Sequence, residues 1–288
     1  MSTRLPAHPV TAAQARRLGV DPRRHPRRWQ KLGHGLYLST HVPVTHEQRI
    51  IAARLYLPRG VALSGPSAAW AHGVEWATPD DAVEITAAPQ ARPAPRAGLV
   101  VRGCVLTTDE VGPTRLGPAT SPVRTAFDLI ARPGPVGHAV AWADAVLRAT
   151  STSAERLRSY VETRSGTRGV RQARAAAELA DPRAESPRES RLRVALILAG
   201  LPAPTPQVEV FDDDGRFVAR LDLAWPELML AVEYDGQHHR DRDQHSRDLR
   251  RHNRLRALGW HVIQVDADGL WRVGELVTLI RAAMAHRV

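Results

Sequence analysis

The stretch RLDLAWPELMLAVEYDGQHH, residues 220–239, decides the fold of the C-terminal part of this chain. Its apolar runs predict two strands joined by a turn at AWPE. Before it, Ser186-Pro187 opens a helix that ends at Gly200, and a strand runs into a DDDG turn. After it we expect a helix, a strand and a last helix, at residues 243–258, 260–267 and 273–286. This order predicts an α/β domain at residues 181–288, with a mixed sheet flanked by helices.

Carboxylates gather on the predicted strands of this domain. Glu233 and Asp235 are two residues apart and share one face of a strand, and Asp222 lies near the same end of the neighbouring strand. Ionised carboxylates that converge repel one another, and a divalent cation such as Mg²⁺ or Mn²⁺ relieves the repulsion. A metal there could polarise a phosphodiester and activate water, so the pattern favours phosphodiester hydrolysis.

The same residues resemble a known group of nucleases. RLDLAWPELMLAVEYDGQHH looks like the core of the PD-(D/E)XK superfamily, and residues 185–285 resemble the domain-of-unknown-function family 559, related to the very-short-patch repair (Vsr-like) endonucleases. The resemblance implies a restriction-endonuclease-like fold. It places Glu189, Asp222 and Glu233 as Mg²⁺ ligands, and Asp235 with His238 as residues that assist the water. Arg250 and Arg251 match a D-x-x-R pattern and, together with Arg247, are expected to bind DNA. Asp235 stands where the superfamily has lysine, so a catalytically silent domain is the alternative.

Structural explanations compete with these roles. Glu189 lies three residues after Ser186, as in a capping box whose glutamate bonds the Ser186 amide. Asp235 precedes Gly236 and could cap a turn. The arginines of the helix at 243–258 are either its solvated face or a surface that follows DNA phosphates.

The start of the chain predicts a small winged-helix-like segment, residues 1–43. Thr11 can cap a short helix that ends at Gly19, and a strand is expected at residues 35–39. The basic residues between them would contact DNA phosphates in a helix-turn-helix, although Pro26 makes a basic loop the alternative. These residues are Arg23, Arg24, Arg27 and Arg28.

A second resemblance covers this start and continues beyond it. VTAAQARRLGV, HGLYLST and SGPSAAWAHGV resemble the winged-helix domain of AbiEi-type antitoxins and imply a DNA-binding regulator. The nuclease and the regulator are therefore the two competing functions.

The middle segment, residues 44–180, predicts a mixed, mainly helical domain without a recognisable catalytic motif. Helices are expected at residues 46–56, 67–72, 123–130, 136–148 and 153–163, and strands at 83–87 and 99–102. We expect a scaffold there, or a surface for a protein partner.

Composition sets broader limits. The chain has 288 residues and a formal net charge of +10, which favours DNA as partner. Lys31 is the only lysine, so a coding bias toward arginine could produce the same excess of positive charge. A single cysteine, Cys104, excludes an intrachain disulfide. With no long apolar run and no signal peptide, we expect a cytoplasmic protein without membrane contact. The sequence does not indicate the oligomeric state.

Overall fold

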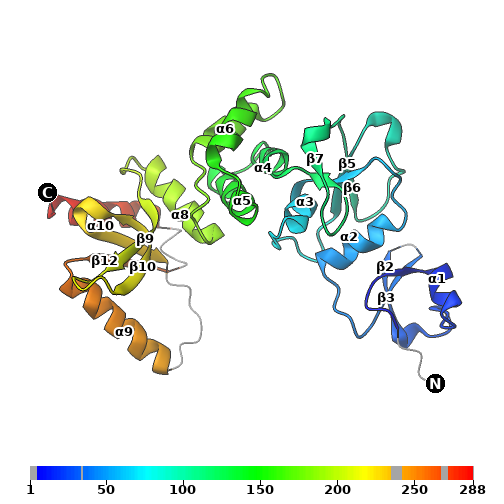
Figure 1. Ribbon diagram of the computed structural model, residues 1–288, viewed down its shortest axis with the longest axis horizontal. Helices are drawn as coiled ribbons and strands as arrows, with labels where there is room; N and C mark the ends of the chain where they lie inside the picture. The colour runs from blue at the N-terminus through cyan, green and yellow to red at the C-terminus, as the bar shows by residue number, and fades with distance from the viewer. Residues whose placement is uncertain (1–4, 34, 235–241, 267–271, 288) are drawn as a thin grey trace. The chain divides into compact units, whose positions relative to one another are not determined.

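The computed structural model describes residues 5–33, 35–234, 242–266 and 272–287, and for residues 242–246 only the helical backbone. The chain divides into two compact units (Figure 1). The first holds residues 1–129 and 149–152, and the second holds residues 130–148 and 153–288. The predicted segment boundaries, after residues 43 and 180, stay predictions.

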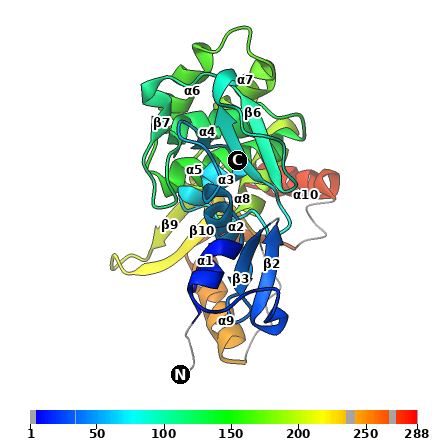
Figure 2. The ribbon, with the colours of Figure 1, turned by 90° about the vertical axis from the view of Figure 1, so that its right-hand side faces the viewer.

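The first unit begins with a small module that we call the N-terminal module, residues 5–43. Three strands form its antiparallel sheet in the order β1-β3-β2, and α1 packs beside them (Figure 2). Thr11 caps α1 in a reciprocal capping box with Gln14, and Gly19 follows the helix in a left-handed conformation, as predicted. The elements are β1 (Val10–Thr11), α1 (Ala12–Arg17), a 3-10 helix (Pro26–Arg28), β2 (Trp29–Gly33) and β3 (Leu36–Ser39).

The predicted helix-turn-helix is not found among the described residues of this module. α1 is its one α-helix there, and the basic segment forms a turn and the 3-10 helix, which corresponds to the basic loop given as the alternative. Proline accounts for the difference, because Pro22 and Pro26 lack the amide hydrogens that a longer helix would use.

The rest of the first unit surrounds a five-stranded sheet in the order β6-β5-β4-β8-β7. β5 is buried along its whole length beneath α2 and α3, and β5 pairs with β6 in parallel. The elements are α2 (His46–Arg54), β4 (Ala62–Leu63), α3 (Gly65–Ala71), β5 (Val83–Ala87), β6 (Leu99–Gly103), β7 (Val111–Gly112), β8 (Ala119–Thr120) and α4 (Pro122–Ile130), together with two short 3-10 helices (Pro89–Ala91 and Thr108–Glu110).

The second unit begins with helices and ends in a layered α/β structure. A buried ion pair joins two of its helices, because Arg193 on α8 lies 2.9 Å from Asp144 on α5 and both side chains are almost fully buried. The helices are α5 (Val136–Ala149), of which residue 149 belongs to the first unit, α6 (Ala154–Glu162), α7 (Val170–Glu178) and α8 (Pro187–Leu198).

A four-stranded mixed sheet forms the centre of this layered part, in the order β12-β11-β10-β9. β9, β10 and β11 are antiparallel, and β12 returns parallel to β11 after α9, as the sequence predicted. Leu223, Leu230 and Val232 pack toward α8 and α10, whereas Leu221 and Ala231 pack toward α9. The elements are β9 (Thr205–Phe211), β10 (Phe217–Trp225), a 3-10 helix (Pro226–Leu228), β11 (Leu230–Tyr234), α9 (Arg242–Ala257), β12 (His261–Val265) and α10 (Val273–Ala285).

The described residues thus form a mixed α/β structure with three sheets. Within the described ranges, no helix is long and apolar enough to cross a membrane.

Candidate functional site

Three of the predicted site residues interact electrostatically in the second unit. Asp222 lies on β10, Glu233 on β11 and Glu189 in the first turn of α8. Burial raises the pKa of Asp222 to about 6, and the nearby carboxylates of Glu189 and Glu233 add to this increase. The backbone amide of Tyr234 opposes it by donating to Asp222 Oδ2 over 2.9 Å. We call these three carboxylates the carboxylate cluster.

Glu233 is neutralised by an arginine of α9. Arg251 donates from both terminal nitrogens to the two carboxylate oxygens of Glu233, at 2.7 and 2.8 Å. This two-pronged geometry is the strongest form of an arginine–carboxylate contact. His252 lies next to the pair, with its Nε2 3.6 Å from Glu233 Oε2. Arg251 therefore supplies the positive charge that the sequence argument assigned to a metal ion.

Glu189 is held by hydrogen bonds to one of its two oxygens. Its Oε2 accepts from the backbone amide of Glu185 at 2.9 Å and from Gln207 Nε2 at 2.8 Å. Ser186 caps α8 by accepting from the Glu189 amide, so this half of the predicted capping box is confirmed. The predicted hydrogen bond from the Ser186 amide to the Glu189 carboxylate is not formed. The amide of Glu185 donates to this carboxylate instead.

Gln207 contributes to the cluster, although sequence reasoning did not single it out. Its φ of +56° is a left-handed conformation that residues other than glycine rarely adopt. Strained positions of this kind concentrate at functional sites. The sequence carries no signal for it, because the contact with Glu189 joins β9 to α8 and depends on tertiary packing.

The predicted metal site is only partly described. The described residues contain no group of three or more His, Cys, Asp or Glu side chains arranged to hold a metal ion. Asp222 Oδ1 and Glu189 Oε1 have no hydrogen-bond partner within the described part, so each could accept a cation. Glu233 could do so only if Arg251 released it. Asp235 and His238, the other predicted site residues, lie outside the described residues.

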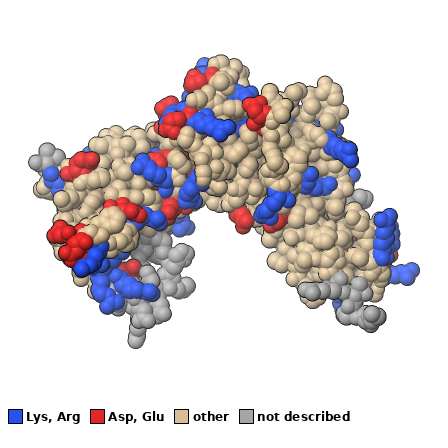
Figure 3. Space-filling model, viewed as in Figure 1, with Lys and Arg blue, Asp and Glu red and all other residues tan. Residues whose placement is uncertain are grey.

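Helix α9 carries the predicted DNA-binding arginines of the second unit. Arg247 and Arg250 are exposed, while Arg251 is half-buried against Glu233. Basic side chains gather over α9 in the space-filling view (Figure 3). Two of the predicted arginines are therefore exposed at the surface, and the third pairs with Glu233.

The N-terminal module carries a stronger excess of basic charge. Arg23, Arg24 and Arg27 are exposed, and Arg28 is half-buried. Asp21 is the one acidic residue between positions 5 and 43, and its side chain accepts from the Arg23 amide at 3.0 Å. The basic residues of this range are Arg16, Arg17, Arg23, Arg24, Arg27, Arg28 and Lys31.

Comparison with known proteins matches the part of the sequence between the N-terminal module and α8 to a family. Residues 61–181 match the family model of the AbiEi antitoxin C-terminal domain. The match includes SGPSAAWAHGV, one of the three stretches that resembled AbiEi-type proteins, and it covers most of the segment predicted as a mixed middle domain. The AbiEi resemblance is confirmed for this stretch, while the other two stretches lie before the match.

Relatives occur in Mycobacterium tuberculosis. The uncharacterized protein Rv2248 of strain H37Rv and the uncharacterized protein MT2308 of strain CDC 1551 are each 34% identical to this chain over 185 residues, which is 64% of this chain and 67% of each relative. The crystal structure of the RV2827C protein of Mycobacterium tuberculosis aligns with 71% of this chain, and the alignment covers 84% of the RV2827C chain. The sequence identity is 19% and the TM-score is 0.38. The chain therefore belongs to the family of the two mycobacterial proteins Rv2248 and MT2308, and its residues 61–181 match the family model of the AbiEi antitoxin C-terminal domain.

Proposed function

We propose that this protein is a DNA-binding regulator of the AbiEi antitoxin type, with the N-terminal module as its DNA-binding part. The observation that carries the proposal is the charge of this module, which has seven basic residues against Asp21 between positions 5 and 43. The AbiEi antitoxin domain that follows supports the same function. Binding of basic side chains to DNA phosphates releases condensed counter-ions, and this release drives association.

The geometry favours contacts with phosphates over the reading of bases. Arg23, Arg24 and Arg27 lie on a turn and a 3-10 helix that are too short to fill a major groove. Thr40 anchors this segment to the sheet, because its amide donates to the Arg28 carbonyl at 3.1 Å and its hydroxyl donates to the Arg27 carbonyl at 3.2 Å. The arginine side chains therefore project from a backbone that is already fixed, which lowers the entropic cost of binding.

The test is binding of a fluorescent duplex, measured by anisotropy over a range of salt concentrations. The duplex carries the promoter that precedes the gene for this chain, and an unrelated duplex of equal length serves as reference. The slope of log K against log salt is negative, and each lost phosphate contact reduces its magnitude by about 0.9. The triple variant Arg23→Ala, Arg24→Ala, Arg27→Ala should lose up to three contacts, which would reduce the magnitude by about 2 to 3.

A second triple variant controls for net charge. Arg156→Ala, Arg168→Ala and Arg171→Ala remove the same charge from three exposed positions of the second unit. This variant should keep the slope of the wild type. Equal losses in both triple variants would mean that net charge alone drives binding, and the assignment to the N-terminal module would be wrong.

A second candidate function is metal-dependent hydrolysis of DNA by the carboxylate cluster. Burial is the main cause of the raised pKa of Asp222, about 6, and the carboxylates of Glu189 and Glu233 add to it. This second contribution favours a metal site, because a divalent cation stabilises carboxylates that repel one another. Under this proposal Asp222 and Glu189 would hold Mg²⁺ or Mn²⁺, with Glu233 joining once Arg251 releases it. The cation would polarise the phosphodiester, and Asp235 or His238 would assist the water.

Cleavage assays separate the two functions. Supercoiled and mismatched DNA are incubated with Mg²⁺ or Mn²⁺ and with wild type, Asp222→Ala or Glu233→Ala. Nicking that both substitutions abolish would establish the nuclease. If wild type and variants are equally inert but bind DNA with a steep salt dependence, the second unit is catalytically silent and the regulator stands.

A further inference from the structure

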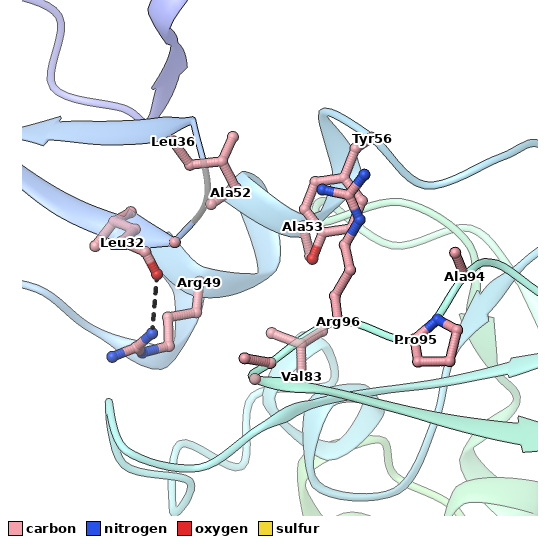
Figure 4. Close-up of a pocket in the computed structure, with 13 residues that line it drawn as sticks. Leu32, Leu36, Arg49, Ala52, Ala53, Tyr56, Val83, Ala94, Pro95 and Arg96 are labelled. Atoms are coloured by element: carbon pink, nitrogen blue, oxygen red, sulfur yellow. Dashed lines mark hydrogen bonds between the residues drawn. The ribbon is translucent and has the colours of Figure 1, made fainter.

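A pocket of about 540 Å³ opens in the first unit between the β2–β3 hairpin, α2 and the loop at residues 94–98 (Figure 4). Pockets that bind small organic molecules generally have volumes of about 300 to 1,000 Å³. The wall is apolar where it is buried, because it is formed by Leu36, Ala52, Ala53 and Val83. The pocket can therefore accommodate an apolar group of moderate size.

Two guanidinium groups line this apolar wall, and none of the lining residues is acidic. Arg49 on α2 donates from one terminal nitrogen to the Leu32 carbonyl at 3.3 Å. Its Nε is buried and has no hydrogen-bond partner among the described residues. A buried donor without a partner costs free energy that a suitable acceptor would recover.

Arg96, on the loop at residues 94–98, lines the pocket beside Tyr56 (Figure 4). Its guanidinium carbon lies 4.3 Å from the centre of the Tyr56 ring, and the side chain is otherwise exposed. Stacking on a ring uses the face of the guanidinium and leaves the N–H groups at its edge able to donate. Burial raises the pKa of Tyr56, so its hydroxyl stays protonated at neutral pH and can donate as well. Neither Arg49 nor Arg96 forms an ion pair with a carboxylate in the described ranges.

We propose that this pocket binds a small organic anion with an apolar body, whose carboxylate or phosphate group is held by Arg96. The apolar body would lie on the alanines of α2, and Arg49, whose guanidinium is turned toward the Leu32 carbonyl (Figure 4), would add positive charge to the same pocket. A neutral ligand of the same shape would lack the charge-assisted hydrogen bonds, which are stronger than those between neutral groups.

Such a ligand would contact two parts of the first unit at once. Leu32 and Leu36 belong to the hairpin of the basic N-terminal module, while Arg49 and Arg96 belong to the part built on the five-stranded sheet. A ligand that prefers one arrangement of these parts shifts the affinity for DNA by its differential binding energy. The pocket would thus make the regulator responsive to an effector, and this step rests on the proposed DNA-binding function.

The binding site itself is tested by isothermal titration calorimetry on the full chain. The probes are 2-naphthoate, 1-naphthyl phosphate and the neutral 2-naphthamide. Charge-assisted hydrogen bonds contribute about tenfold or more to affinity, so at least one anion should bind about tenfold more tightly than the amide. The tighter of the two anions identifies the ligand as a carboxylate or a phosphate.

Substitutions assign the binding to the pocket. Arg96→Ala should weaken binding of the preferred anion about tenfold, and because Arg96 is exposed the variant should fold normally. Arg59→Ala is the matched control, since Arg59 is an exposed arginine of the same unit that does not line the pocket. The proposal is overturned if neither anion binds, if the amide binds equally well, or if Arg96→Ala binds like the wild type.

The regulatory step has a separate readout. DNA affinity is measured by anisotropy with and without the preferred naphthyl anion, for wild type and Arg96→Ala. A change in affinity that Arg96→Ala abolishes supports an effector site, and an unchanged affinity overturns that role. If the chain does not bind DNA at all, the proposed function fails while the calorimetric result on the pocket still stands.

Discussion

Removing the charge of Asp222 should stabilise the protein at alkaline pH. The pKa of this carboxyl is raised from an ordinary value of 3.8 to about 6, mainly by burial. A shift of one unit corresponds to about 1.4 kcal/mol, so the full shift corresponds to about 3 kcal/mol. Because Asp222 is partly exposed, solvent screening reduces the expected effect to about 1–2 kcal/mol.

Whether stability rises or falls with pH depends on which state, folded or unfolded, binds the proton of Asp222 more tightly. The folded protein holds the proton more tightly than the unfolded chain, so its contribution to stability is greatest below about pH 4 and decreases between about pH 4 and pH 6. Asp222→Asn keeps an oxygen that can accept from the Tyr234 amide and removes the charge. At about pH 8 the variant should exceed the wild type by about 1–2 kcal/mol, and at about pH 4 the two should be nearly equal.

The assay is urea unfolding at several pH values, with hydrogen exchange of β10 and β11 peptides to assign the transition to the second unit. Asp213→Asn is the matched control, because Asp213 is an exposed aspartate in the turn between β9 and β10. The reasoning would be refuted if Asp222→Asn were less stable than the wild type at about pH 8. It would also be refuted if the difference in the free energy of unfolding between the two proteins were the same at every pH. Added Mg²⁺ should stabilise the wild type and not Asp222→Asn if the carboxylate cluster binds the metal.

Two further substitutions test the packing of the second unit. Arg193→Met should lower the free energy of unfolding in urea by about 3–5 kcal/mol, because it leaves the buried Asp144 carboxylate without its ion-pair partner. Adding Asp144→Leu should recover part of the loss. No recovery would contradict the ion-pair explanation. Gly169→Ala should cost at least about 2 kcal/mol more than Gly166→Ala in the same assay. Both glycines have left-handed φ angles, so the backbone strain is similar. A Cβ at Gly169 would lie 2.0 Å from the Ala131 carbonyl oxygen, whereas a Cβ at Gly166 would face open space. Equal costs for the two glycine variants would show that backbone strain alone accounts for the effect.

Local sequence patterns predicted most elements of the second unit. The strands around AWPE, the helix capped by Ser186 and the return of β12 all follow from apolar periodicity and turn residues, which act over short ranges. The pattern missed β2 and α7. It also missed the strands β1, β4, β7 and β8, because strands of two residues carry no periodicity.

The candidate site was predicted in part. Asp222 and Glu233 were expected to lie together because two adjacent strands carry them, and the charge of Glu233 adds to the increase in the pKa of Asp222 that burial mainly causes. The pairing of Glu233 with Arg251 could not be predicted, since it depends on how α9 packs on the sheet. The pocket formed by Arg49, Tyr56 and Arg96 gave no signal either, because its residues come from separate segments.

The sequence by itself determined the charge of the chain, the order of its main helices and strands, and the carboxylates on two adjacent strands. These features depend on composition and on contacts between residues close in the chain. Only the tertiary structure decided which cation neutralises Glu233, which residues hold Glu189, and where two unpaired arginines share an apolar pocket. Long side chains such as arginine reach several alternative partners, so their pairing is fixed only when distant segments pack together.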